Sequence, residues 1–87
     1  MNGIHGTEDA VLALRSALRR RGIAAMDGDL SGSVRAEHAG IRVTVRYADH
    51  RWWRPMSGAA EVTVPVAREG DEDALARRLT DELLGRL

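Results

Sequence analysis

The segment IRVTVRY at residues 41–47 constrains the fold more than any other stretch, because apolar and polar residues alternate through it without a break. Successive side chains of a β-strand point to opposite faces, so this segment predicts a strand. Its apolar residues, mostly Val and Ile, lie on one face, with Arg42, Thr44 and Arg46 on the other. A strand with a single apolar face is typical of an antiparallel sheet that is covered on one side. The rest of the chain must supply the neighbouring strands and the cover.

Two further segments alternate in the same way and predict those neighbouring strands. Residues 33–37 precede the strand at 41–47, and the short segment HAG between them predicts that the two strands form a hairpin. Residues 61–66 alternate again, and Pro65 has no N–H donor, which places this strand at an edge or leaves part of it unpaired. Residues 23–26, with the sequence IAAM, form either a brief fourth strand or a loop.

Helical periodicity marks both ends of the chain. A lead-in at residues 1–6, which we expect to be frayed, precedes a helix that Thr7 can cap and Gly22 can end. A second helix opens at Gly70 and Asp71, and acidic residues gather near its start, where carboxylates offset the positive end of the helix dipole. Both helices repeat apolar residues at spacings of three and four, so each has one buried face.

These elements predict one α+β domain over residues 1–87: a helix, three antiparallel strands, or four if residues 23–26 form one, and a second helix, with both helices on one face of the sheet. The residues expected to face the core are Val11, Leu14, Leu18, Ile41, Val43, Val45, Val62, Val64, Val66, Leu75, Leu79 and Leu83. None of them is aromatic. We therefore expect a thin core and marginal stability for a domain of this size.

Both tryptophans stand side by side in the stretch HRWWRP. If the preceding strand continued its alternation, Asp49 and Arg51 would turn inward, and burying unpaired charges costs a great deal of free energy. The alternation must therefore break near residues 48–50, through a bulge or a loop. Adjacent residues of an extended segment point to opposite sides, so at most one of Trp52 and Trp53 fills the core.

Two interpretations of this stretch stay open. In the first, the two rings patch the aliphatic core and cover the open end of the sheet. In the second, one ring and the neighbouring arginines form a contact surface, since Trp and Arg are common among the residues that dominate binding energy. The candidate partner-binding residues are Arg42, Arg46, Arg51, Trp52, Trp53 and Arg54.

Composition and motifs argue against an enzyme. The chain has no cysteine, which excludes a disulfide framework, a thiolate metal site and a cysteine nucleophile. The stretch DGDLSG at residues 27–32 resembles the opening of a calcium loop, but His38 stands where such a loop has its bidentate Glu, so we interpret the stretch as a turn. Histidines and serines are scattered outside any catalytic motif. The sequence predicts no catalytic residue, no metal and no cofactor.

By elimination, we expect a non-catalytic protein-interaction or regulatory module that contacts a partner protein, or a second copy in a homodimer, through the outer sheet face and the Trp-Arg loop. The alternative is an accessory nucleic-acid-binding domain that uses the arginines at 42, 46, 51 and 54 with an exposed tryptophan. The third hypothesis is a purely structural domain of a larger assembly.

Thirteen arginines balance thirteen acidic residues, so the net charge of the chain gives no overall attraction to nucleic acid or to a membrane. No apolar run approaches the ~20 residues that cross a bilayer. We expect a cytoplasmic protein, and the absence of lysine suggests a GC-rich bacterial genome.

Overall fold

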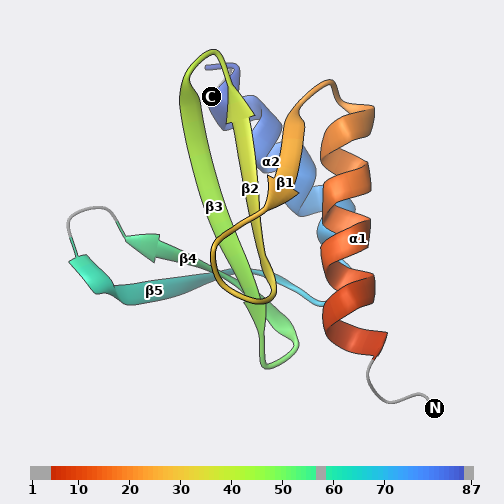
Figure 1. Cartoon of the computed structure of the whole chain (residues 1–87), viewed down its shortest axis with the longest axis vertical. Coiled ribbons are helices and arrows are strands. Elements are labelled where there is room, and N and C mark those ends of the chain that lie inside the picture. Colours follow the sequence, from red (N-terminus) through yellow and green to blue (C-terminus); the bar gives the residue numbers. More distant parts are fainter. Residues whose placement is uncertain (1–4, 57–58, 86–87) are drawn as a thin grey trace.

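The computed structural model describes residues 5–56 and 59–85, and the side chains of residues 5, 56 and 59–62 lie outside the description. Five strands form one antiparallel sheet in the order β1-β2-β3-β4-β5, so each strand pairs with the next along the chain. Two helices pack on the same face of this sheet (Figure 1). The elements are α1 (His5–Arg20), β1 (Ala24–Asp27), β2 (Ser33–His38), β3 (Ile41–Ala48), β4 (Arg51–Met56), β5 (Ala59–Arg68) and α2 (Glu72–Leu83).

This architecture confirms the predicted α+β class and corrects the strand count. The segment left open at residues 23–26 is strand β1, shifted by one residue. The tryptophan segment was expected to be a loop, yet it is strand β4. The sheet therefore has five strands in the described part of the chain, where the sequence predicted three or four.

Two tight hairpin turns set the register of the central strands. Ala39 and Gly40 join β2 to β3, and Asp49 and His50 join β3 to β4. All four residues have positive φ, at 53°, 82°, 54° and 62°, as a two-residue turn needs to match the twist of its strands. The predicted hairpin is confirmed, and the break predicted near residues 48–50 is the second of these turns.

Helix α1 ends as predicted but begins earlier. Gly22 has a φ of 82°, its N–H donates to the Arg19 carbonyl at 3.0 Å, and the Ile23 N–H donates to the Leu18 carbonyl at 3.0 Å. This pair of bonds is a Schellman motif, which closes a helix with a left-handed residue. The prediction that Thr7 caps the start was wrong, because the helix already includes residues 5 and 6. Residues 1–4 of the expected lead-in lie outside the described residues.

Aromatic side chains complete a core that the sequence suggested was purely aliphatic. Trp52 is 0% exposed and Tyr47 is 7% exposed, and their rings meet edge-on with centroids 5.5 Å apart. Ile41, expected inside, is 53% exposed because it is the first residue of β3, next to a hairpin turn. The predicted core residues that are buried are Leu14, Leu18, Val43, Val45, Leu75, Leu79 and Leu83. Val11, Val64 and Val66 are half-buried, and the side chain of Val62 lies outside the description.

Arginines from the helices hold backbone carbonyls on both edge strands. Arg19 of α1 donates to the Ala25 carbonyl of β1 at 2.8 Å, and Arg78 of α2 donates to the Val66 carbonyl of β5 at 2.7 Å. Pro65, which is exposed on β5, offers no N–H, and the predicted edge position of this strand is confirmed. One occupied carbonyl on each edge strand, together with the proline on β5, leaves fewer backbone groups free to pair with an added strand.

Candidate interaction surface

The sheet face opposite the helices, here called the outer face, is hollowed by a groove of about 590 Å³. The loop between β1 and β2 passes in front of β2 and β3, while the β4–β5 hairpin turns away from them (Figure 1). The space between these two features is the outer groove, whose lining includes Leu30, Arg35, Thr44, Arg46, Trp53 and Pro55. Leu30, on the loop, is 61% exposed.

The two tryptophans lie on opposite faces of β4. Trp52 is fully buried against the helices, and its Nε1 donates to Glu72 Oε2 at 3.0 Å. Trp53 is half-buried in the outer groove, and its Nε1 donates to the Ala48 carbonyl at 2.8 Å. The prediction that at most one ring fills the core is confirmed. Trp52 is removed from the candidate contact residues, because no part of its side chain reaches solvent.

Arg54, too, does not belong to the candidate surface. It points to the helix face, where its two terminal nitrogens donate to the two carboxylate oxygens of Glu82 on α2, at 2.7 and 2.5 Å. This hydrogen bonding raises the pKa of Arg54 and lowers the pKa of Glu82. Arg54 therefore ties β4 to α2 and cannot act on the outer face.

The other predicted residues divide into two groups. Arg46 lies directly opposite Trp53 in the sheet register, and its Nε donates to the Ser31 carbonyl at 3.2 Å. Arg51 is two residues from Trp53 on the same face of β4 and is exposed. Arg42 is farther along β3 and forms an ion pair with Glu37 at 3.5 Å. Of the predicted arginines, the structure thus places only those at 46 and 51 near the half-buried Trp53 ring.

Sequence reasoning missed two arginines of the outer face. Arg35 stands opposite Thr44 in the sheet register and lines the outer groove. One of its terminal nitrogens lies 3.3 Å from the Met26 sulfur, and its buried Nε has no hydrogen-bond partner in the structure. The alternation of residues 33–37 could have placed it there. Arg68 is directly opposite Arg51. That position could not be read from the sequence, because β4 itself was not predicted.

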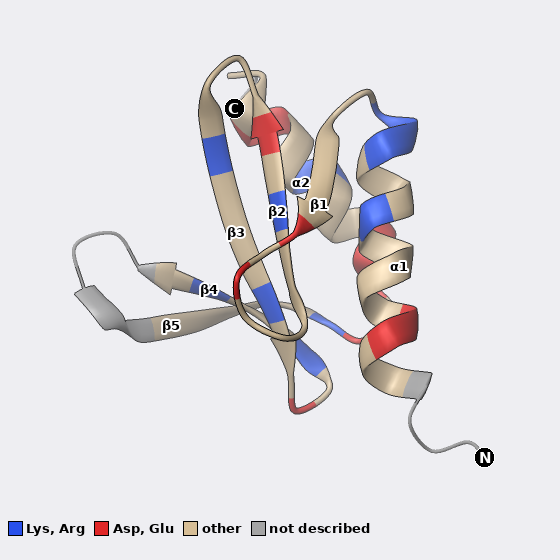
Figure 2. Cartoon of the chain, viewed as in Figure 1, with Lys and Arg blue, Asp and Glu red and all other residues tan. Residues whose placement is uncertain are grey.

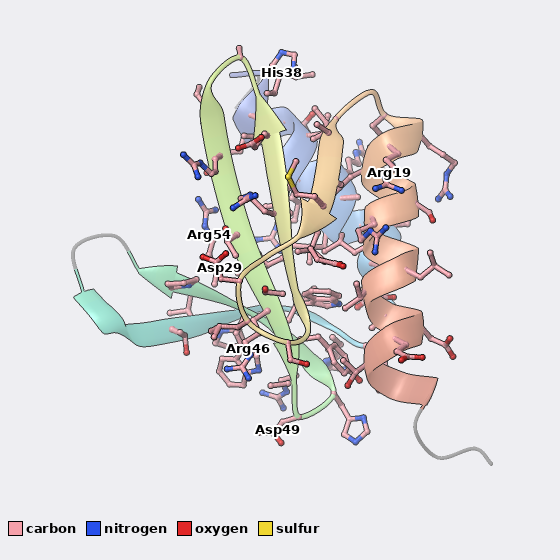
Figure 3. The ribbon with its side chains drawn as sticks, in the orientation of Figure 1. Arg19, Asp29, His38, Arg46, Asp49 and Arg54 are labelled. Carbon is pink, nitrogen blue, oxygen red and sulfur yellow. The ribbon has the colours of Figure 1, made fainter. Side chains whose placement is uncertain are left out.

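Figure 2 marks the arginines and the acidic residues along the ribbon. The arginines differ in whether a carboxylate neutralises them. Those with an ion pair between 2.5 and 3.6 Å are Arg15, Arg20, Arg21, Arg42 and Arg54. Within the described ranges, those on the outer face with no ion pair are Arg35, Arg46, Arg51 and Arg68. Asp29 and Asp49 also line the outer groove, from the loop and the turn (Figure 3). Among the described residues, the outer face therefore has four arginines without an ion pair, and two carboxylates line its groove.

A second polar cluster lies at the β3–β4 turn. The Tyr47 hydroxyl donates to Glu69 Oε1 at 2.8 Å, and His50 Nδ1 lies 2.7 Å from the same oxygen. Burial, followed by the bond to Glu69, raises the pKa of Tyr47 to about 12, while the bonds from His50 and Tyr47 lower the pKa of Glu69. Neither Tyr47 nor Glu69 exchanges a proton near pH 7, so this cluster is a tie between the turn and the β5–α2 connection.

The raised pKa of Tyr47 predicts a loss of stability in alkali. An unfolded tyrosine ionises near pH 10, whereas the folded chain keeps this proton to about pH 12. The contribution is therefore complete below about pH 10 and lost as the pH rises toward 12. Urea unfolding from pH 8 to 12 measures it, and absorbance at 295 nm follows the single tyrosine. A Tyr47→Phe protein has no hydroxyl to ionise and should lack this decline; an equal decline in both proteins would contradict the assignment.

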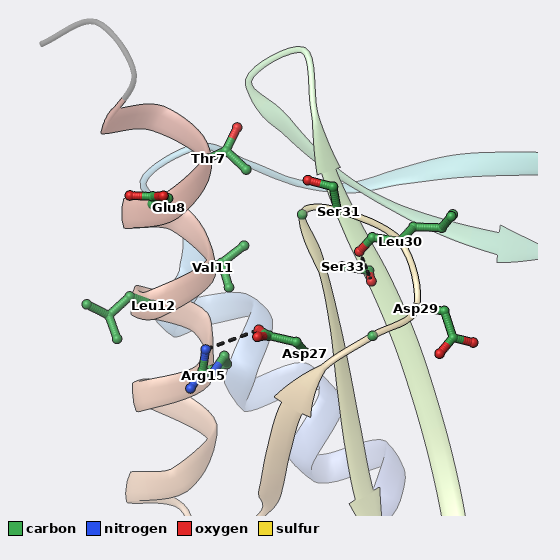
Figure 4. Close-up of a pocket in the computed structure, with 12 residues that line it drawn as sticks. Thr7, Glu8, Val11, Leu12, Arg15, Asp27, Asp29, Leu30, Ser31 and Ser33 are labelled. Carbon is green, nitrogen blue, oxygen red and sulfur yellow. Dashed lines mark hydrogen bonds and ion pairs between the residues drawn. The ribbon is translucent and has the colours of Figure 1, made fainter.

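Residues 28–32 form the connection between β1 and β2 where the sequence predicted a turn over residues 27–32, while Asp27 is the last residue of β1. The two aspartates of this stretch point apart (Figure 4). Asp27 forms an ion pair with Arg15 of α1 at 3.1 Å, while Asp29 lies on the other side of the loop. The Ser33 hydroxyl and N–H both donate to the Leu30 carbonyl, at 2.5 and 3.1 Å, which fixes the turn. A second groove of about 490 Å³ separates this loop from α1. Among the described residues, no three acidic or histidine side chains converge on one point as metal ligands would.

Neither helix of the described chain is long and apolar enough to cross a membrane. Comparison of the chain with family models, with curated proteins and with solved structures gave no match.

Proposed function

We propose that this chain is a non-catalytic protein-interaction or regulatory module, cytoplasmic as expected from the sequence, and that the outer groove is its docking surface. The observation that carries this proposal is the placement of Trp53. Its ring lines a hollow on the uncovered sheet face, beside the exposed Leu30, while the adjacent Trp52 serves the core. Large amphipathic rings in partly desolvated hollows are typical of residues that dominate protein interfaces.

The contacts on the edge strands favour a partner that binds the outer face over a partner that adds a strand to the sheet. A partner that extends the sheet needs free backbone groups on an edge strand. Arg19 and Arg78 already occupy edge carbonyls, and Pro65 has no donor. The outer groove is consequently the surface that best supports recognition.

The nucleic-acid alternative has less support from the geometry. Of its four arginines, Arg42 is neutralised by Glu37 and Arg54 faces the helices. The aspartates at positions 29 and 49 line the groove and would repel a phosphate backbone. A single partly exposed indole also offers few stacking platforms for successive bases.

Photocrosslinking in the source cells tests the proposal. A benzophenone amino acid replaces Thr63, which is exposed on the groove wall, or Ala74, which is exposed on α2. We expect a discrete adduct from position 63 alone, and we expect Trp53→Ala to abolish it. A second copy of the chain in the adduct would identify a homodimer. Equal labelling from both positions, no adduct from position 63, or an adduct indifferent to Trp53→Ala would contradict the proposal.

A further inference from the structure

Two arginines stand directly opposite each other on neighbouring strands of the outer face. Arg51 of β4 pairs in register with Arg68 of β5, and both side chains are exposed. They line a shallow cavity of about 330 Å³ with Pro65, Ala67 and Asp71, and neither forms an ion pair with a described residue. Like charges in this arrangement destabilise a sheet. The pair therefore weakens the free chain, and an anionic ligand is the partner that would offset it.

The arginine pair lies on the same face of the sheet as the outer groove, close to Trp53. Arg51 is two residues from Trp53 on the same face, which corresponds to about 7 Å along the strand. Arg46 stands opposite Trp53 on β3, and Arg35 lies one strand farther, opposite Thr44. Arginines without an ion pair to a described residue thus stand on two sides of the half-buried indole.

We infer that the outer groove, as the docking surface of the proposed function, receives a protein segment with at least two carboxylates beside an apolar side chain. The apolar side chain packs against Trp53 and Leu30. One carboxylate is bound by Arg35 or Arg46, and the other bridges Arg51 and Arg68. A guanidinium binds a carboxylate through two parallel hydrogen bonds, so each contact contributes both attraction and orientation.

An acidic protein segment fits this surface better than a nucleic acid does. Carboxylates occur at chosen positions of a peptide, so a segment can avoid the aspartates at positions 29 and 49 of the groove. A phosphodiester backbone has a charge at every nucleotide and cannot avoid them. The chain as a whole is also neutral, with thirteen charges of each sign.

Selection from a library of random 12-residue peptides tests the inference and needs no identified partner. The immobilised chain should enrich peptides in which Asp or Glu flanks Leu, Ile, Val or an aromatic residue. Fluorescence anisotropy then compares the best peptide with a labelled 20-nucleotide oligothymidine. We expect the peptide to bind and the oligonucleotide to bind at least about 10-fold more weakly. Preferential binding of the oligonucleotide would overturn the inference.

Two charge variants separate the arginine pair from general electrostatics. Arg68→Gln should weaken the selected peptide about 10-fold or more, the range expected for loss of a hydrogen bond to a charged group. Arg77→Gln removes the same charge from the exposed face of α2 and should leave affinity unchanged. Equal losses in the two variants would assign the effect to net charge and overturn the inference.

Arg68→Glu adds a readout that a purely structural role would not give. It replaces a like-charged pair with an opposite pair, so the melting temperature of the free chain should rise by about 1–6 °C. Binding of the acidic peptide should be lost in the same protein. A variant that is stabilised but still binds, or one that is destabilised, contradicts the inference.

The pattern of losses distinguishes this inference from the proposed function beneath it. If the selected peptides are lost with Trp53→Ala but lack acidic residues and tolerate Arg68→Gln, the groove docks proteins and only the acidic character is wrong. If Trp53→Ala leaves binding of the selected peptides unchanged, the groove is not the docking surface, and both this inference and the proposed function fail.

Discussion

Trp52→Ala should cost about 3–5 kcal/mol of unfolding free energy, a large part of the total for a domain of this size. The Trp52 side chain is fully buried, it meets Tyr47 edge-on at 5.5 Å, and its Nε1 is bonded to Glu72. Alanine removes all three contributions and leaves a cavity that neighbouring side chains fill only in part. Urea unfolding followed by far-ultraviolet circular dichroism measures the loss.

Trp53→Ala is the matched control, because it deletes the same side chain from the adjacent residue. We expect a loss of about 1 kcal/mol, consistent with a half-buried ring and one hydrogen bond to a carbonyl. The two variants should therefore separate stability from recognition. Similar losses of stability in both would contradict the opposed orientation of the rings.

Glu72→Leu should cost about 1–3 kcal/mol, because it leaves buried donors without an acceptor. Glu72 is 7% exposed; one of its oxygens accepts from Trp52 Nε1 at 3.0 Å, and the carboxylate also accepts from the Gly70 N–H at 3.1 Å. Leucine fills a similar volume but accepts nothing. Glu72→Gln keeps one acceptor oxygen and should cost less. The measurement is again the urea midpoint, with the slope checked for a constant unfolding transition.

A double-mutant cycle assigns that cost to the indole bond. In a Trp52→Phe background the ring has no N–H, so the further change Glu72→Leu should be cheaper than it is in the wild-type chain. Equal costs in the two backgrounds would show that the carboxylate contributes to stability without the tryptophan. The cycle requires both single variants to fold, and phenylalanine keeps most of the apolar area of the core.

Local periodicity predicted the parts of the fold that depend on local chemistry. The alternation of residues 41–47 predicted β3, and Gly22 predicted the end of α1, because each follows from the backbone preferences of a few neighbouring residues. The opposite orientation of adjacent side chains also separated Trp52 from Trp53. It could not decide which ring was inside, since that depends on the turn that precedes them.

The parts of the fold and of the candidate surface that were not predicted depend on strand pairings between residues far apart in the sequence. Strand β4 was not predicted because its sequence, RWWRPM, includes a proline and does not alternate between apolar and polar residues. The turn before it, at Asp49 and His50, also lacks the glycine that usually marks a two-residue hairpin turn. The register of β5 shifts between Trp52 and Trp53, so Val66 has no partner on β4. Only this shift places Arg68 opposite Arg51. The acidic residues near α2 were expected to serve the helix dipole, whereas Glu69 and Glu72 bind Tyr47 and Trp52.

Both helices pack behind the sheet, so a tether that enters through α1 or leaves through α2 joins the molecule away from the outer face (Figure 1). A fluorescent protein, a solid support or a neighbouring domain could be joined to one helix without covering Trp53. The geometry suits a fusion in which the outer groove stays accessible whichever helix is used for attachment.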